Sequence, residues 1–375
     1  MNSLFIQQQT ELDSLIARMQ PNQIYGLDTE FIKVDTLWPK LGVLQINLER
    51  QVYLLDGTTL DLTQFWHHIF QAKQNIFHAC GEDIDLIYHF SKQRNLDNVF
   101  DTQVALAFLG YGLQISYQNA LKLILNIDIE KDQTRSDWLA RPLSTEQLNY
   151  AANDVLYIMQ LAERIKWMLN EKKLLAYVEE DCRHLTYEIG QKMPLACLYQ
   201  DIGHYRYSRR QLMQIQQLAQ WREQLACSQN IPRSFILKNI TINDLVEKNP
   251  KTIFQLSSVK NIRPNIIRDH GKTILALLKE LPEPTLWPEK LPKPFRYYLN
   301  DTAQQIDNLV QKVSYQLDIP KEILLRKKWL TALQQHVLTH SAQATLPCYL
   351  LGWRYDLLTV PVIALLQADQ QAAVA

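Results

Sequence analysis

The chain has 375 residues, more than one hydrophobic core usually organises, so we expect two or three domains. Its 47% hydrophobic and 21% charged residues are ordinary globular values, which exclude a disordered chain, and no apolar run approaches the roughly 18 residues of a membrane-spanning helix. The net charge is zero, but residues 1–200 carry 17 basic against 25 acidic side chains, and residues 201–375 carry 22 against 14.

Strand patterns open the chain. Apolar residues predict three strands with a tight turn near residue 48, which would form an antiparallel meander, at 23–31, 41–48 and 51–56. A short strand at 75–79 should lead into a helix at 82–93, whose apolar residues recur at helical spacing.

One more strand and three helices follow, and the first 170 residues therefore indicate an α/β fold. The strand is expected at 99–102, and the helices at 103–109, 116–126 and 145–170. Ser116 and Ser144 precede the last two helices as N-cap candidates.

Beyond Tyr199 the strand signal disappears. Helices are predicted at 209–229, 243–249, 251–255 and 265–281, and a second helical set runs from 301 to 366. A proline-rich stretch at 282–294 separates the two sets and suits a semi-rigid spacer. The two sets share a rough layout, which suggests a duplicated module.

Two acids lie at i and i+2 on the first predicted strand. Asp28 and Glu30 therefore project from the same face, where they could share a cation. A buried acid pair needs a positive partner, and no lysine or arginine lies within the strand, so a metal ion is the obvious candidate. The alternative is an edge strand whose acids face water.

Two further acids stand at helix positions. Asp83 falls in the first turn of a predicted helix, where capping alone would explain a carboxylate. Tyr150 and Asp154 lie four residues apart on another predicted helix, so phenol and carboxylate share one face. Taken alone, such a pair more often reflects packing and solvation than chemistry.

The combination is more specific than its parts. Asp28, Glu30, Asp83 and Asp154 in this order, with Tyr150 four residues before the last acid, resemble the DEDD superfamily of 3′-5′ exonucleases. The tyrosine is typical of the tyrosine-type branch, since the histidine of the other branch would stand at Asn149. Residues 100–103 and 131–143 are similar to the ribonuclease D family in particular, and residues 209–281 and 295–366 resemble its paired HRDC domains.

The resemblance implies an architecture and an activity. The fold would be an α/β, ribonuclease H-like exonuclease domain with a mixed sheet over residues 1–200, followed by two all-α HRDC-like domains over 205–284 and 293–375. The activity would be hydrolysis of RNA from a free 3′ end, with release of 5′-mononucleotides and with precursor tRNA as the implied substrate. We expect a monomer, because no heptad repeat suggests assembly.

The resemblance also implies two divalent ions, Mg²⁺ or Mn²⁺, which suit hard oxygen ligands. Asp28 would bridge both ions, Glu30 and Asp154 would hold the one that binds the attacking water, and Asp83 would reach the other through water. Tyr150 would orient that water, because a phenol with a pKa near 10 is a poor base at neutral pH.

Weaker predictions concern RNA contacts. Lys131 and Arg135 could bind phosphates and Phe31 could pack on the terminal nucleotide, although surface cations and a core phenylalanine are the default explanations. A basic track for RNA is expected in the helical half, at Arg206, Arg209, Arg210, Lys260, Arg263, Arg268 and residues 326–328. A merely solvated basic face is equally compatible.

Several other classes of site and function are disfavoured. Five widely spaced cysteines without a CxxC pair argue against disulfides and zinc, and the N-terminus lacks a secretion signal, so we expect a cytoplasmic protein. Gly271-Lys272-Thr273 imitates a P-loop, but position 266 is an isoleucine, so ATP use is not expected. Two alternatives stay open: a DNA exonuclease, because no motif reads a 2′ hydroxyl, and a non-catalytic RNA-binding adaptor.

Overall fold

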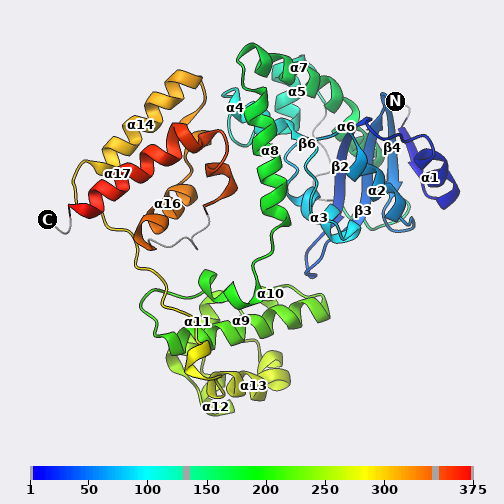
Figure 1. Ribbon diagram of the computed structural model, residues 1–375. Helices are drawn as coiled ribbons and strands as arrows, with labels where there is room; N and C mark the ends of the chain where they lie inside the picture. Colours follow the sequence, from blue (N-terminus) through cyan, green and yellow to red (C-terminus); the bar gives the residue numbers. More distant parts are fainter. Residues whose placement is uncertain (1–2, 130–135, 340–345, 373–375) are drawn as a thin grey trace. The chain divides into compact units, whose positions relative to one another are not determined.

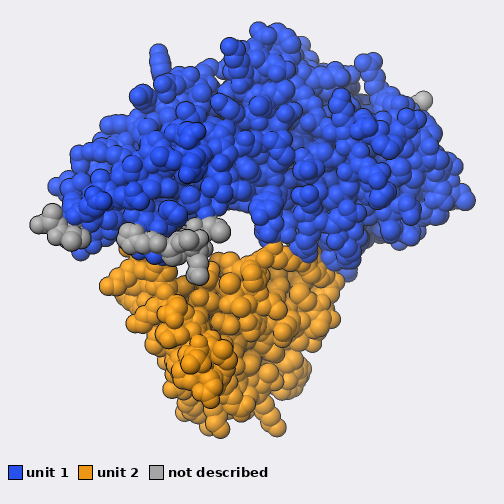
Figure 2. Space-filling model, viewed as in Figure 1, with its two compact units in different colours: residues 1–32, 40–191, 295–375 blue, residues 33–39, 192–294 orange. Residues whose placement is uncertain are grey.

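The computed structural model describes residues 3–129, 136–339 and 346–372. The chain forms two compact units, coloured separately in Figure 2. Unit 1 contains residues 1–32, 40–191 and 295–375, and unit 2 contains residues 33–39 and 192–294. No helix in the described part of the chain is long and apolar enough to cross a membrane.

Unit 1 is built around a mixed sheet, part of which Figure 1 labels. In the described residues this sheet has six strands in the order β1-β4-β3-β2-β5-β6. The strands are β1 Ser3–Ile6, β2 Ile24–Ile32, β3 Lys40–Leu48, β4 Gln51–Asp56, β5 Gln74–Phe77 and β6 Val99–Asp101. β2, β3 and β4 pair antiparallel, whereas β1 joins β4, and β5 joins β2 and β6, in parallel. The predicted meander and the mixed sheet are both confirmed, while β1 was not predicted.

Within the described residues of the N-terminal part, eight helices accompany the sheet. They are α1 Gln9–Ile16, α2 Thr63–Gln71, α3 Gly81–Ser91, α4 Thr102–Phe108, α5 Tyr117–Leu125, α6 Thr145–Leu156, α7 Ile158–Glu171 and α8 Leu175–Gly190. Ser116 and Ser144 accept N-cap hydrogen bonds from the backbone N–H groups of Asn119 and Gln147, as predicted. The single helix expected over 145–170 is wrong, because the chain breaks at Tyr157, which has φ −106° and ψ 2°.

The break between α6 and α7 is explained by a side chain of β3. The Asn47 amide donates to the carbonyls of Val155 and Leu156 at 2.8 and 3.1 Å, so the last carbonyls of α6 are bound by a strand side chain. Close packing follows at Gly26 of β2, where an added Cβ would lie 2.3 Å from Ile158 and 3.4 Å from Asn47. The junction of α6 and α7 therefore lies directly on this face of the sheet.

The C-terminal helices complete unit 1. They are α14 Thr302–Leu317, α15 Lys321–Leu324, α16 Lys327–Thr339 and α17 Val360–Gln371, with short turns at Cys348–Leu350 and Tyr355–Thr359. Their apolar residues Val310, Ile323 and Leu358 belong to the same buried cluster as Phe108 and Leu161. The region 295–375 therefore shares a core with the sheet region.

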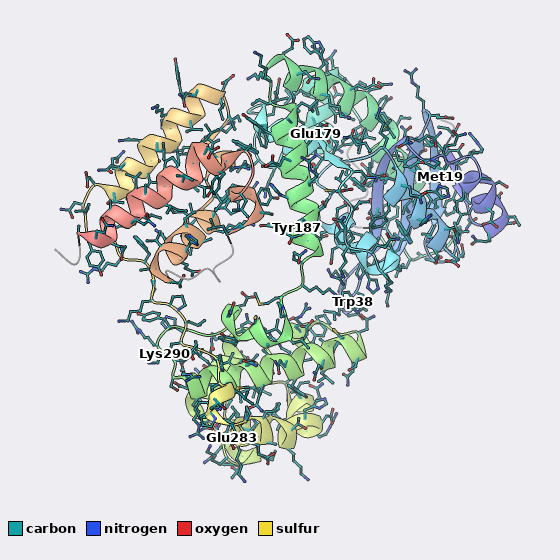
Figure 3. All side chains as sticks on the ribbon, in the orientation of Figure 1. Met19, Trp38, Glu179, Tyr187, Glu283 and Lys290 are labelled. Atoms are coloured by element: carbon teal, nitrogen blue, oxygen red, sulfur yellow. The ribbon has the colours of Figure 1, made fainter. Side chains whose placement is uncertain are left out.

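A buried ion pair fixes this docking to α8, the helix on which Figure 3 labels Glu179 and Tyr187. Arg354 donates to both carboxylate oxygens of Asp181 at 2.6 and 2.7 Å, and its side chain is 0% exposed. The Trp353 ring stacks on Tyr177 with centroids 4.6 Å apart and donates its indole N–H to Asp181. The Asp181 charge is thus fully bonded.

Unit 2 is all-helical and has its own core. Its helices are α9 Arg209–Gln229, α10 Arg233–Ile236, α11 Asn239–Lys248, α12 Ile253–Ser257 and α13 Pro264–Lys279, with short turns at Leu195–Asp201 and Pro284–Leu286. Trp38, labelled in Figure 3, joins this unit through its backbone N–H, which donates to Asn230 at 3.0 Å. Arg209 donates to the carbonyls of Trp287 and Pro288, so it binds the proline-rich stretch.

The two helical sets share a turn of the same construction. Asn230, with φ 51°, caps the C-terminus of α9, and the next helix begins after Pro232. Asp318, with φ 52°, caps α14 in the same way, and the next helix begins after Pro320. In both turns a backbone N–H reaches back five residues, from Ile231 to Ala226 and from Ile319 to Ser314. The shared turn supports the suggested duplication.

Candidate active site

β2 carries the first two acids. Asp28 and Glu30 alternate with buried Leu27 and Thr29 along the strand, so their carboxylates point to one face. The register between β2 and β3 shifts directly after Glu30, which marks a bulge at this end of the strand. Both acids are partly buried.

The third acid enters from the start of α3. Asp83 is buried in the first turn of this helix, where its carboxylate accepts a hydrogen bond from the Thr29 hydroxyl. The turn before α3 is held by Asp101 of β6, whose carboxylate accepts the N–H groups of Ala79 at 3.1 Å and Cys80 at 2.8 Å. Asp101 therefore positions the segment that carries Asp83.

The last acid and the tyrosine come from α6. Tyr150 and Asp154 lie one helical turn apart on the same face of α6, so the phenol and the carboxylate are neighbours. The Tyr150 ring packs against buried Trp138, with centroids 6.0 Å apart. Arg141 fixes the Trp138 segment to the sheet, because it bonds the Trp138 carbonyl at 2.9 Å and the Asp56 carboxylate at 2.5 and 2.7 Å.

These side chains converge in one pocket of about 300 Å³. Carboxylate oxygens of Asp28, Glu30 and Asp154 lie within 4.8 Å of one another, and Asp83 and Tyr150 line the same pocket. Its complete lining is Asp28, Thr29, Glu30, Phe31, His78, Ala79, Glu82, Asp83, Tyr117, Tyr150, Asp154 and Ile158. The sequence had separated these five predicted residues by up to 126 positions, and the fold brings them together.

The acids repel one another in a poorly solvated place. Burial first, and then the charges of Asp83, Asp154 and Glu30, hold the pKa of Asp28 well above its usual range. Burial followed by neighbouring carboxylates raises the pKa of Glu30 to about 8. Burial likewise raises the pKa of Asp154 to about 7 and that of Asp83 to about 6. The four carboxylates therefore favour binding of protons or of a cation, either of which reduces their mutual repulsion.

The residues fit a divalent cation. None of the ion pairs formed within residues 3–129, 136–339 and 346–372 involves any of the four acids. Carboxylate oxygens at this spacing are the donors that Mg²⁺ and Mn²⁺ prefer. The acidic cluster is therefore consistent with a site for divalent ions.

The predicted RNA contacts have different outcomes. Phe31 lines the pocket and is partly buried, whereas Lys131 and Arg135 lie outside the described residues. Several cations of the expected basic track already have partners in unit 2: Arg209 binds the proline-rich stretch, Arg263 lies over the Phe235 ring, and Arg268 pairs with Asp269.

Sequence reasoning missed several polar residues around the acids. His78 lines the pocket with both ring nitrogens bonded, Nδ1 to the Thr102 hydroxyl and Nε2 to the Ile115 carbonyl. Gln45 of β3 is directly opposite Asp28 in the sheet, and Tyr117 of α5 lines the pocket. A polar residue within the apolar strand 41–48 was the only sequence signal for Gln45, and nothing in the sequence distinguished Tyr117.

Comparisons with known proteins identify the family to which the chain is similar. The family described as 3′-5′ exonuclease matches residues 4–170, and the HRDC domain family matches residues 211–278. Ribonuclease D of Pseudomonas paraeruginosa is 32% identical over 348 residues, which cover 90% of each chain. Ribonuclease D of Psychromonas ingrahamii is 30% identical over 358 residues and covers 93% of this chain and 96% of that one.

Solved structures with a similar fold include another ribonuclease D. The crystal structure of Escherichia coli RNase D, described as an exoribonuclease involved in structured RNA processing, matches with a TM-score of 0.87 at 25% identity. The match covers 98% of this chain and 99% of that one. The catalytic core of Trypanosoma brucei RRP6, at 19% identity and a TM-score of 0.56, shares the fold.

Proposed function

The chain belongs to the ribonuclease D family of 3′-5′ exoribonucleases, and we propose that it shortens structured RNAs, precursor tRNA among them, by releasing 5′-mononucleotides. One observation carries the proposal: three carboxylates from β2 and α6 lie within 4.8 Å of one another, in a pocket that also holds Asp83 and Tyr150. Hydrolysis breaks the bond between phosphorus and the 3′ oxygen, and water supplies the oxygen and proton that complete the products.

We assign the metal-holding role to Asp28, Glu30, Asp83 and Asp154. When bound, divalent ions supply activation of water and stabilisation of the departing oxygen. The raised pKa values of these acids support the assignment, because their charges are poorly compensated by the chain itself. Thr29 holds the Asp83 carboxylate through its hydroxyl, and so limits the directions in which that acid points.

Tyr150 is assigned to positioning the attacking water, as in the tyrosine-type branch. Burial, and then the Asp154, Glu30 and Asp28 charges, raise the pKa of its phenol far above neutrality. It therefore stays protonated and donates hydrogen bonds. Trp138 packs against its ring, which restricts the phenol to the pocket side of α6.

We further propose that both helical sets are HRDC-like modules, one within residues 205–284 and one within 293–375. The shared turn after α9 and α14 supports this duplication. The basic excess of residues 201–375 favours attraction of an RNA backbone to this half. We expect one chain per particle, which the mass measured by light scattering in solution tests.

The test uses a 3′-extended precursor tRNA and a DNA of the same sequence, each with Mg²⁺ or Mn²⁺. We expect stepwise release of 5′-mononucleotides from the RNA, loss of release in Asp154→Asn, and normal release in the control Asp128→Asn, which removes an exposed acid paired with Lys122. Release that survives Asp154→Asn contradicts the site. Faster hydrolysis of DNA contradicts the substrate, and absence of both release and metal binding favours the adaptor.

A further inference from the structure

Two buried polar groups beside the acids have hydrogen-bonding capacity that the fold does not use. Gln45 is 0% exposed, and neither its amide nitrogen nor its amide oxygen has a partner in the described part of the chain. The Tyr117 hydroxyl is also buried and lacks a partner there. An unsatisfied buried polar group destabilises the fold, so each group needs an explanation.

Gln45 is aimed at Asp28 by the sheet. The two residues are directly opposite in the antiparallel β2–β3 pair, so their side chains share one face with Cβ atoms roughly 5 Å apart. The other cross-strand neighbour of Gln45 is Leu54, which is apolar. Asn47, two residues along the same face, has its amide nitrogen bound to α6 carbonyls. Asp28 is therefore the charged neighbour across the sheet from this amide.

Tyr117 approaches the acids from α5. Tyr117 lines the same pocket as Asp28 and Asp154. Burial, and then the charge of Asp154, raise the pKa of its phenol. The described part of the chain offers this phenol no hydrogen-bond partner. The phenol hydrogen therefore lacks an acceptor, and a carboxylate of the pocket is the group that could supply one.

We propose that Gln45 and Tyr117 are positioning residues for the metal-holding acids, Gln45 for Asp28 and Tyr117 for Asp154. The inference rests on the metal site of the proposed function and adds two residues outside its set of acids. A carboxylate has about four lone-pair sites, and a cation uses only some of them. The amide hydrogens of Gln45 and the phenol hydrogen of Tyr117 form hydrogen bonds to the carboxylate lone pairs that do not coordinate the cation. These hydrogen bonds fix the orientation of each metal-holding carboxylate.

The positioning role predicts that removing either polar group maintains or raises the stability of the metal-free protein but lowers its affinity for Mn²⁺. Gln45→Met and Tyr117→Phe remove the unsatisfied atoms with little change in shape, so the metal-free protein should unfold at the same temperature or higher. Loss of a partner behind a ligand typically weakens metal binding 10- to 100-fold. We therefore expect Mn²⁺ affinity to fall at least about 10-fold in each variant.

The experiment uses the full chain without RNA, with Mn²⁺ titrated by calorimetry and thermal unfolding followed in EDTA. Matched controls are Tyr88→Phe and Gln214→Met, because Tyr88 donates to the Thr186 carbonyl and Gln214 to the Leu278 carbonyl. The controls should lose stability and keep their Mn²⁺ affinity.

Unchanged Mn²⁺ affinity in Gln45→Met and Tyr117→Phe overturns the inference, whatever happens to their stability, and leaves the proposed function standing. Failure of the unaltered protein to bind Mn²⁺ overturns the metal site itself, and the inference with it. Weaker Mn²⁺ binding together with retained or raised stability in EDTA supports both.

Discussion

Buried carboxylates occur in two regions of unit 1, and they are stabilised differently. Asp181, where the C-terminal helices dock on α8, receives two hydrogen bonds from Arg354 and one from Trp353. Asp28, Glu30 and Asp154 in the pocket have one another as neighbours, and no ion pair formed by the described residues includes them. A structural acid has its countercharge within the chain, whereas the pocket acids require one from solution.

The largest effect should come from Asp28→Asn, which removes one pocket charge. Release of nucleotides should fall by more than the roughly 100-fold expected for a residue behind a metal ligand. In EDTA the same variant should unfold at a higher temperature, because repulsion among the acids is relieved. RNA digestion and thermal unfolding check the two parts. A variant less stable than the parent in EDTA would contradict the comparison.

The next effect is at the docking region. Arg354→Met leaves Asp181 buried and unpaired, so the free energy of unfolding should fall by about 3–5 kcal/mol, measured by urea denaturation. Adding Asp181→Leu should recover most of this loss, because the stranded charge is gone. If the double variant is no more stable than Arg354→Met alone, the unpaired charge of Asp181 is not the cause of the lost stability.

The free energy of unfolding should depend on pH with opposite signs for the pocket acids and for Asp56. The pKa of Glu30 is raised to about 8 in the folded chain, so its contribution is fully present below the unfolded value of 4.5 and is lost as pH rises through 8. Asp154, raised to about 7, acts in the same direction. In EDTA the free energy of unfolding should therefore fall by on the order of 3 kcal/mol between pH 5 and pH 8, from several such groups. Saturating Mg²⁺ should flatten this slope.

The smallest effect concerns Asp56, which Arg141 holds. Although burial opposes ionisation, hydrogen bonds from Arg141 and Thr58 lower the pKa of Asp56 to about 2. Its stabilisation is present above the ordinary value near 4 and is lost as pH falls through 2. Compared with the parent, Asp56→Asn should be about 2 kcal/mol less stable at pH 7, and the difference should vanish near pH 2. Urea denaturation at several pH values measures it.

The sequence predicted the sheet meander because alternation and turn residues act locally. It also indicated the four acids and Tyr150 as one set, through their order, and the pocket geometry supports that prediction. It did not predict β1, since four residues paired in parallel with β4 depend on a partner about fifty positions away. The break at Tyr157 escaped for a similar reason, because Asn47 on another element ends α6.

The polar residues behind the acids were harder to predict. Gln45 stands in an apolar strand, and its position opposite Asp28 depends on a register that the sequence does not state. The role expected of Arg209 in an RNA track was weakened by the structure, because its guanidinium binds carbonyls of the proline-rich stretch. Partners of long cationic side chains depend on tertiary structure, which charge counts do not report.

Apart from the short segment 33–39, unit 2 is formed where the chain leaves unit 1 after α8 and returns to it at residue 295. The segment 192–294 is therefore an insertion joined to unit 1 at both ends. Cutting the chain once within 282–294 would leave the C-terminal helices attached through Arg354, Trp353 and their apolar neighbours. During synthesis unit 2 has all of its residues before unit 1 does. The nuclease part must wait for its final helices to leave the ribosome before its core is complete.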